Sequence, residues 1–498
     1  MNAGDILIAN PGDRIAVDGV IVKGVSHIDE SMLTGESVFP EKEKDAKVYA
    51  GSLCADGRIM YRAETVGCGT AISKIVRFVE NARSSKAPIE RIADRVSGYF
   101  VPVVFGIALL SFVLWAVFGG DFSFALNIFV SVLVVACPCA LGLAAPMSVI
   151  IATGIGANYG ILFKNAESIE QLSEVTVAAL DKTGTLTEGK LMITDICAAE
   201  GVPELSVLIS AAEVNKNSNH PVAKAIVREA ERRGIEIKDC TEFVYHQGLG
   251  MTGKADGIYI KSGSGKFFKE EEISSFSAPA GICVNEGKNI TFVMRGYKVI
   301  GFIAAADVLK PDTVSVISRL KESGITPVML TGDNSTSARI QAEKAGIERV
   351  ISDVLPEQKA EEIGKLKTEG KTVMIGDGIN DAPALSAADV GIAVGGGADI
   401  ATDAASVVLT GSSLRGAADA VTLSKKTMRN IKQNLFLAFI YNIIVIPVAA
   451  GALFPFFGIA LTPVIAAAMM SLSDVSVIVN ALRLNCFRSR FRTLVMKI

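Results

Sequence analysis

Aspartates follow three apolar runs of the sequence, at positions where strands are predicted to end. Asp181 closes the run VTVAALD and precedes KTGTLTEG, TGDN covers residues 331–334, and GDGINDAP covers residues 376–383. Ligands of an α/β sheet bind at the carboxyl ends of its parallel strands. One such cluster of Gly, Asp and Asn usually only forms a turn. Three of them at successive strand ends predict a catalytic site.

The residue types in these clusters suit phosphoryl transfer. Asp181 can act as a nucleophile and form an aspartyl-phosphate. Lys359 can offset the charge of the phosphoryl group, and Thr331 can hydrogen-bond to it. Asp377 and Asp381 offer the hard oxygen ligands that Mg²⁺ prefers. The sequence therefore predicts an α/β domain with a phosphoaspartate site.

Four apolar segments predict membrane spans. Residues 98–118 and 122–157 carry no charge, and a second pair covers residues 433–453 and 458–482. Each segment reaches the length of about 20 residues that crosses the hydrocarbon layer. Lys and Arg flank the third and fourth segments, and the positive-inside rule then places both chain ends and residues 165–430 in the cytoplasm.

The composition agrees with a chain of membrane and soluble parts. Of the 498 residues, 50% are hydrophobic and 20% charged, which is too apolar for an ordinary soluble enzyme and too charged for a membrane bundle alone. The net charge of −3 gives no indication of a nucleic-acid partner. The eight cysteines are scattered except for Cys137 and Cys139. No disulfide framework is predicted, and a reducing cytosol is expected.

The pattern of strands, helices and apolar segments divides the chain into six parts. The predicted parts are a β-rich domain at 1–85, a transmembrane hairpin at 98–157, an α/β domain in two pieces at 175–192 and 306–412, an inserted α+β domain at 193–305, and a second transmembrane hairpin at 433–482.

Two cysteines lie in the middle of the second predicted span. Cys137 and Cys139 flank Pro138, which has no N–H to donate and opens the helix. Two thiolates at such a break form a soft site suited to Cu⁺, Ag⁺ or Zn²⁺. The alternative is two small residues that pack beside a kink.

Taken together, DKTGTLT, TGDN and GDGIND resemble the motifs of the P-type ATPases, whose catalytic core is haloacid-dehalogenase-like. The resemblance runs from near residue 1 to about residue 484. It implies a multidomain membrane protein with an α-helical transmembrane bundle of four spans. It also implies a β-rich actuator domain, partly present at 1–85, a haloacid-dehalogenase-like α/β phosphorylation domain and an inserted α+β nucleotide-binding domain.

The resemblance assigns the catalytic residues. It implies that ATP phosphorylates Asp181 and that this residue binds Mg²⁺ together with Asp377 and Asp381. In the segment TGES, it implies that Glu36 directs the water that hydrolyses the aspartyl-phosphate; without the resemblance, TGES is only a polar turn. The remaining catalytic positions belong to the same motifs or were named above: Lys182, Thr183, Thr331, Asp333 and Lys359.

The resemblance also places ATP in the inserted domain. His220 and Pro221 match the His-Pro signature of the heavy-metal branch, in which the imidazole lies near the adenine. Gly248 and Gly250 match the accompanying GxG, where missing side chains let ATP approach the backbone. One position departs from the pattern, because Asn215 stands where an acidic residue is usual.

The last two spans indicate the transported ion. Tyr441, Asn442 and Met470 resemble the Cu⁺-transporting subgroup, and a thioether favours monovalent copper. The Zn²⁺/Cd²⁺ subgroup places an Asp at the position of Met470. Asp474 departs from the pattern, because Ser is expected there. We hypothesise that Asp474 lies at the ion pathway, since an intramembrane carboxylate is costly and usually functional.

The resulting interpretation is an ATP-driven exporter of Cu⁺, with Ag⁺ as a second candidate, in the plasma membrane with its soluble domains in the cytoplasm. Its expected partners are the lipid bilayer, the Cu⁺ ion and a cytosolic copper chaperone. Heavy-metal pumps usually have eight spans and only four are predicted, so an N-terminal truncation is expected. The alternatives are a Zn²⁺/Cd²⁺ pump, a phosphatase of the haloacid dehalogenase class, and a non-transporting metal-binding fragment.

Overall fold

The structure is a computed structural model that describes most of the chain. The described residues are 1–30, 39–119, 121–137, 139–333, 335–377, 381–395, 404–487 and 489. The chain divides into two compact units. The first unit consists of Met1–Val177 and Ile363–Ile498, and the second of Ala178–Glu362.

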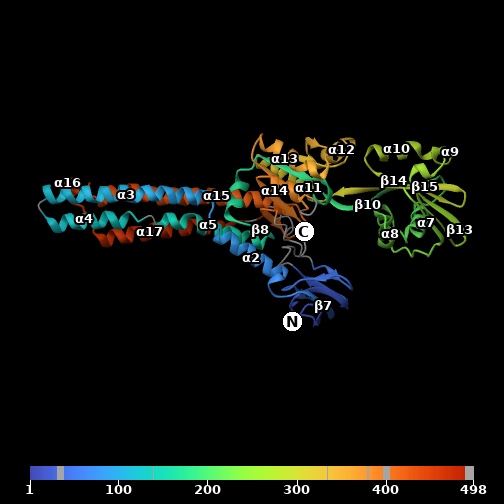
Figure 1. The fold of residues 1–498 in the computed structure, drawn as a ribbon, viewed down its shortest axis with the longest axis horizontal. Helices are drawn as coiled ribbons and strands as arrows, with labels where there is room; N and C mark the ends of the chain where they lie inside the picture. Colours follow the sequence, from blue (N-terminus) through green and yellow to red (C-terminus); the bar gives the residue numbers. More distant parts are fainter. Residues whose placement is uncertain are drawn as a thin grey trace. The chain divides into compact units, whose positions relative to one another are not determined.

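The first unit begins with a small β-domain, whose last long strand β7 is labelled in Figure 1. Its antiparallel sheet has the order β1-β7-β2-β5 and consists of β1 (Ile6–Ala9), β2 (Asp18–Lys23), β5 (Lys47–Val48) and β7 (Ile59–Thr65). A smaller sheet consists of β3 (Ser26–Asp29), β4 (Glu41–Lys42) and β6 (Leu53–Cys54). Successive side chains of a strand face opposite sides, and Ile21, Ile28 and Ile59 fill the core between them.

A buried carboxylate joins this β-domain to the helix that follows it. Asp18 is 5% exposed, and its two oxygens accept the backbone N–H groups of Ala50 at 2.8 Å and Ala71 at 2.7 Å. Ala71 is the first residue of α2 (Ala71–Ser84). Asp18 therefore supplies a hydrogen-bond acceptor to a free N–H at the helix start.

Four helices of the described residues are long and apolar enough to cross a membrane, as predicted: Pro88–Phe118, Phe122–Asn158, Arg415–Ala449 and Pro463–Cys486. The second contains a break between α4 (Phe122–Val135) and α5 (Cys139–Asn158), and the others contain α3 (Pro88–Phe118), α15 (Arg415–Ala449) and α17 (Pro463–Leu482). These helices pack along one another (Figure 1). The first helix begins ten residues before the predicted start at 98, because a charged first turn continues into the apolar segment.

Buried amides hold three of these helices together. Asn434 donates to Ser148 Oγ at 3.2 Å and accepts from Asn480 Nδ2 at 2.7 Å. Asn430 donates to the Asn480 carbonyl at 2.8 Å and accepts from Ser148 Oγ at 2.8 Å. Since these four residues come from α5, α15 and α17, the network fixes the register of the three helices.

The first unit also contains parallel strands of the α/β type. β18 (Thr372–Gly376), β19 (Val390–Val394) and β20 (Val407–Leu409) pair in parallel, and β8 (Ile161–Phe163) pairs with β20 in the antiparallel direction. All residues of these strands are buried, which is typical of strands covered on both faces. Two short helices, α6 (Ala166–Ser173) and α14 (Ala382–Ala387), lie in the same region.

The second unit contains a further set of α/β strands. β9 (Val177–Asp181), β16 (Thr326–Leu330) and β17 (Arg349–Ile351) follow the order β17-β16-β9, and β16 pairs with β17 in parallel. The connecting helices are α11 (Thr313–Glu322), α12 (Ser335–Ala345) and α13 (Lys359–Lys367). This alternation confirms the α/β class predicted for residues around Asp181 and Lys359.

A six-stranded antiparallel sheet forms the rest of the second unit, with the order β10-β15-β14-β13-β12-β11. Its strands are β10 (Thr187–Ala198), β11 (Thr241–His246), β12 (Gly250–Ala255), β13 (Ile258–Gly263), β14 (Asn289–Arg295) and β15 (Lys298–Leu309). The helices are α7 (Glu204–Asn215), α8 (Pro221–Arg232), α9 (Glu270–Ile273) and α10 (Ser277–Asn285). Val207, Ile226 and Ile303 belong to the core between α7, α8 and the sheet.

The amide network yields a stability prediction. We expect Asn480→Ala to lower the melting temperature of the chain in detergent, because it leaves the buried Asn434 side-chain oxygen on α15 without the hydrogen bond from Asn480 Nδ2, at a cost of about 1–3 kcal/mol. The matched control is Ser471→Ala on the same helix, since Ser471 is exposed and its hydroxyl, among the described residues, bonds only back to Ala467 O. Equal melting temperatures for both variants would contradict this role of the network.

Candidate functional site

Asp181 lies at the end of β9 and is 6% exposed. The Lys359 ammonium lies 2.5 Å from its Oδ1 atom. Both side chains are largely buried, so each charge depends on the other for compensation. The structure thus brings together the predicted nucleophile and the lysine predicted to offset phosphoryl charge.

The turn Lys182–Leu186 follows the nucleophile directly. Gly184 has φ of 76°, which a residue with a Cβ atom adopts only at a cost. A Cβ on Gly189 would lie 2.9 Å from the Gly184 Cα, so the chain passes too closely for a side chain there. Thr183 is exposed beside the buried Asp181. The turn therefore leaves Thr183 accessible next to the nucleophile.

Two charged residues that were not predicted from the sequence support this turn. Asp307 accepts from the Thr187 hydroxyl at 2.6 Å and from the Gly189 N–H at 3.0 Å. The Lys310 ammonium donates to the Gly184 carbonyl at 2.9 Å. Burial lowers the pKa of Lys310. Both residues end the apolar run IGFIAAADVLK, which carries the same strand-end signal as the three recognised clusters.

A second ion pair lies within the same unit. The Lys182 ammonium is 2.5 Å from Asp333 Oδ2. Thr331 is 2% exposed, and its hydroxyl accepts the Asp333 N–H at 3.1 Å. Asp333 of the TGDN segment therefore contacts Lys182, the residue next to the nucleophile, and Thr331 hydrogen-bonds to Asp333. The fourth residue of that segment, Asn334, lies outside the described residues.

The carboxylates predicted for Mg²⁺ belong to the first unit. Asp377 follows β18, and Asp381 precedes α14 and is 1% exposed. A Cβ on Gly376 would lie 2.3 Å from Asp381 Oδ2, so the glycine makes room for this carboxylate. No three His, Cys, Asp or Glu side chains of the described residues gather closely enough to hold a metal. Two carboxylates still fit Mg²⁺, which commonly completes its shell with water and substrate phosphates.

One predicted catalytic residue is not placed. Glu36, with the rest of the TGES segment, lies outside the described residues, which omit 31–38. Its assignment remains a prediction from the sequence.

Three of the four residues predicted for ATP line one cavity of about 230 Å³ in the second unit. His220, Gly248 and Gly250 all contribute to its wall. His220 caps α8, accepting the Val222 N–H at 3.3 Å, and Pro221 is the first residue of that helix. A Cβ on Gly250 would lie 2.2 Å from the Ser262 carbonyl oxygen, so the wall needs glycine at this position.

Asn215, which stands where the family usually has an acidic residue, lies in the same cavity and donates hydrogen bonds there. Asn215 lines the cavity and is 2% exposed. Its amide donates to the Ala211 carbonyl at 2.8 Å and to the Ser262 hydroxyl at 3.0 Å. A carboxylate could not make these donations unless it was protonated.

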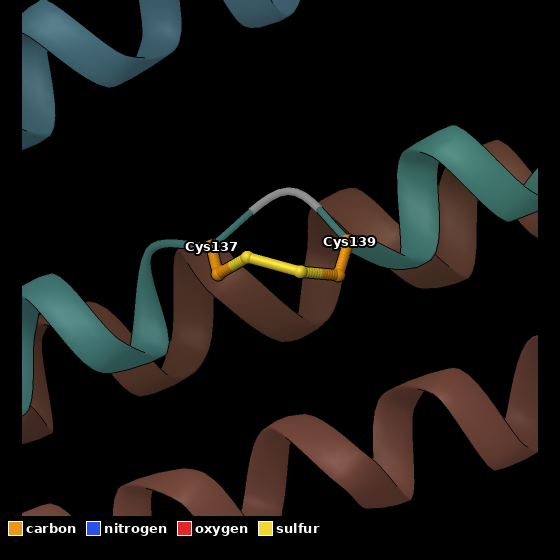
Figure 2. The surroundings of a disulfide bond; sticks show 2 residues. All are labelled: Cys137 and Cys139. Carbon is orange, nitrogen blue, oxygen red and sulfur yellow. A yellow bond between two sulfur atoms is a disulfide. The ribbon is translucent and has the colours of Figure 1, made fainter.

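Cys137 and Cys139 are joined by a disulfide (Figure 2). This corrects the expectation of two free thiolates without a disulfide. The physical reason is the break between α4 and α5, which leaves the two Cα atoms 5.4 Å apart, within the range of disulfides. Pro138, between them, lies outside the described residues. The two sulfurs are thus adjacent, and they become metal ligands only after reduction.

The other predicted ion residues lie on two neighbouring helices. Tyr441 and Asn442 belong to α15, and Met470 and Asp474 to α17; all four are partly buried. Asp474 Oδ1 is buried with no hydrogen-bond partner among the described residues. A carboxylate oxygen in that position is costly to bury.

Comparisons with known proteins agree with this arrangement. Residues 1–80 match the P-type ATPase actuator domain, and residues 175–389 and 364–421 match haloacid dehalogenase-like hydrolases. A solved structure of a zinc-transporting PIB-type ATPase in the E2.Pi state is 32% identical, with a TM-score of 0.70 over 97% of this chain and 79% of that one. The chain belongs to the P-type ATPases.

Curated members of the family are more similar in sequence. Copper-transporting ATPase 2 of Rhizobium meliloti is 45% identical over 97% of this chain and 59% of its own length. The silver exporting P-type ATPase of Salmonella typhimurium is 46% identical over 97% of this chain and 60% of its own. The chain thus spans about three fifths of the length of these relatives.

The disulfide yields a prediction about metal binding. We expect the chain to bind additional Ag⁺ after treatment with a phosphine, which supplies the two electrons that convert the disulfide into two thiols. Calorimetric titration of oxidised and reduced chain measures the difference. The variant Cys137→Ser/Cys139→Ser controls for the free cysteines elsewhere, among them Cys54 and Cys486, and should show no such gain. Equal Ag⁺ binding before and after reduction would contradict the prediction.

Proposed function

We propose that this chain carries the ATP turnover and part of the membrane pathway of a Cu⁺-exporting P-type ATPase that also accepts Ag⁺. The observation that carries the proposal is the buried Asp181 at a strand end, paired with Lys359 at 2.5 Å. The high identity to a copper-transporting and a silver-exporting relative supports the choice of ion.

The geometry around Asp181 supports the proposed phosphorylation step. Its carboxylate oxygen attacks the terminal phosphorus of ATP, the bond to the bridging oxygen breaks, and ADP leaves. Lys359 is already in place to offset the added charge, and Thr331 can donate a hydrogen bond to the phosphoryl oxygens. Asp377 and Asp381 would hold Mg²⁺, which neutralises phosphate charge.

Hydrolysis of the aspartyl-phosphate restores the starting carboxylate. Water attacks the phosphorus, the bond to Asp181 breaks, and inorganic phosphate leaves. We assign to Glu36 the direction of this water and the acceptance of its proton. This assignment rests on the TGES segment of the sequence.

ATP binding is assigned to the cavity lined by His220, Gly248 and Gly250. Its glycines permit a ligand to approach the backbone, and the imidazole can stack on a base. Tyr245, Leu249 and Met251 also line the cavity and offer apolar surface to the face of an adenine ring.

The membrane residues supply the ion ligands. The reduced Cys137 and Cys139 provide soft thiolates and Met470 a thioether, which together favour Cu⁺. Tyr441 and Asn442 lie on the facing helix α15. A Zn²⁺ pump is the second candidate, because solved zinc-transporting structures share the fold at 32–33% identity and Asp474 adds a harder ligand.

We further propose that the protein resides in the plasma membrane with its soluble domains in the cytoplasm. Support comes from the basic residues beside the third and fourth spans, such as Arg429 and Arg483. A cytosolic copper chaperone is the proposed donor of Cu⁺, since free Cu⁺ is bound tightly by thiols in a reducing compartment.

Phosphoenzyme formation tests the proposed function. The reduced chain in lipid vesicles receives labelled ATP and Mg²⁺ with Cu⁺, Ag⁺ or Zn²⁺ in turn. We expect label with Cu⁺ and Ag⁺, and none in Asp181→Asn, because the amide is no nucleophile. A response to Zn²⁺ alone would establish the second candidate. Absence of metal-dependent label would contradict the assignment of ATP turnover to this chain.

The role of Asp474 is tested by Asp474→Ser. If this carboxylate lies at the ion pathway, the variant should change the rate of metal-dependent ATP turnover by tenfold or more, which corresponds to about 1.4 kcal/mol. It should also alter the pH profile of that rate. Ser476→Ala, on the same helix, serves as the matched control, since the Ser476 hydroxyl bonds to the Ser473 carbonyl and to no other group of the described residues. An unchanged profile in Asp474→Ser would remove the residue from the pathway.

A further inference from the structure

A basic cavity of about 670 Å³ lies in the first unit, beside the charged half of α15 and the end of α17. Lys425, Arg429 and Lys432 contribute from α15, and Arg483 follows the last residue of α17. Four cations from two separate segments thus line one concavity.

Three of these four cations are not neutralised by carboxylates of the described residues. Among the described residues, Arg429, Lys432 and Arg483 form no ion pair, and Arg483 instead donates to the Asn480 side chain at 2.8 Å. Within the part of the wall that the structure describes, Glu174 is the acidic residue, and it pairs with Lys371 at 2.7 Å. The cavity therefore presents a net positive charge that a ligand could neutralise.

The cavity continues from this charged region into an apolar one. Phe436 and Leu437 line it one turn beyond Lys432, and Phe436 is 64% exposed. Beyond Lys432, residues 433–449 of α15 carry no Lys, Arg, Asp or Glu. The cavity thus lies at the boundary where a spanning helix passes from headgroups to hydrocarbon.

A second, adjoining cavity extends the basic surface. Its volume is about 400 Å³, it shares Arg429, Gln433 and Arg483 with the first, and it adds Lys426. A row of basic residues that merely orients a span needs no concavity. Cations gathered in a hollow next to an exposed aromatic ring match a ligand with an anionic head and an apolar tail.

We propose that this cavity binds an anionic phospholipid, with the headgroup phosphate among Arg429, Lys432 and Arg483 and an acyl chain along Phe436. Arginine forks pair well with phosphate oxygens, and basic pockets beside spanning helices bind anionic headgroups. The lipid would bridge α15 and α17, the two helices that carry the proposed ligands Tyr441 and Met470. The binding is separate from ATP turnover and can be measured without it.

Native mass spectrometry of the full chain tests the proposal. The chain is released from micelles that contain equal amounts of phosphatidylcholine and phosphatidylglycerol of different mass. We expect retained phosphatidylglycerol to exceed phosphatidylcholine. The variant Arg429→Gln/Lys432→Gln should lower that retention about 25-fold, at about fivefold for each cation removed near the headgroup.

The matched control is Arg415→Gln, which removes an exposed cation from the start of α15 outside both cavities. It should retain phosphatidylglycerol like the parent chain. The pair Arg429→Lys/Lys432→Arg keeps the charges and should retain most of the binding. Because Arg429 and Lys432 are exposed, the variants at these two positions should unfold at the same temperature as the parent.

Three outcomes would overturn the proposal. Equal retention of the two lipids would show no preference for the anionic headgroup. An equal loss in Arg415→Gln would show that overall charge, and not the cavity, holds the lipid. Displacement of phosphatidylglycerol by excess inorganic phosphate would identify the cavity as a site for soluble anions.

Discussion

The ion pair between Asp181 and Lys359 is the interaction on which the catalytic unit depends. A carboxylate that is 6% exposed at the end of a buried strand is stable only with a cation beside it. The same cation is what a phosphoryl group on that carboxylate would need. The structure therefore already contains the positive charge that the proposed phosphorylated state would need, and the close-packed turn at Gly184 leaves Thr183 exposed beside the buried nucleophile.

A comparable constraint governs the membrane segment. A spanning helix must satisfy the hydrogen bonds of its backbone groups internally, yet this helix is interrupted between α4 and α5. The break leaves Cys137 and Cys139 adjacent, so one geometry serves either a disulfide or a pair of thiolate ligands. The redox potential of the compartment decides which of the two forms. The disulfide and the proposed binding of a metal ion by the two thiolates exclude each other.

The sequence predicted the strand-end carboxylates, because apolar runs followed by Asp are a local signal. It also predicted the four spans from their length. It did not predict Asp307 and Lys310, although they end a similar run, because neither belongs to a motif that stood out. The Asn430–Asn480 network was also not predicted. Which side chains meet across two helices depends on how the helices are aligned along one another, and the composition of each helix does not determine that alignment. The disulfide was missed because cysteine spacing alone does not reveal how the break aligns the sulfurs.

The cavity proposed for ATP contains one residue, Asn215, that departs from the family's motif. Asn215 is 2% exposed, and both of its described hydrogen bonds are donated by the amide nitrogen, to Ala211 and Ser262. The side-chain oxygen retains its acceptor capacity. A carboxylate in this position would also accept, but it would have to be buried as a charge or protonated. Asn215 therefore keeps an acceptor of the kind that a base amino group needs, without a buried negative charge in the wall.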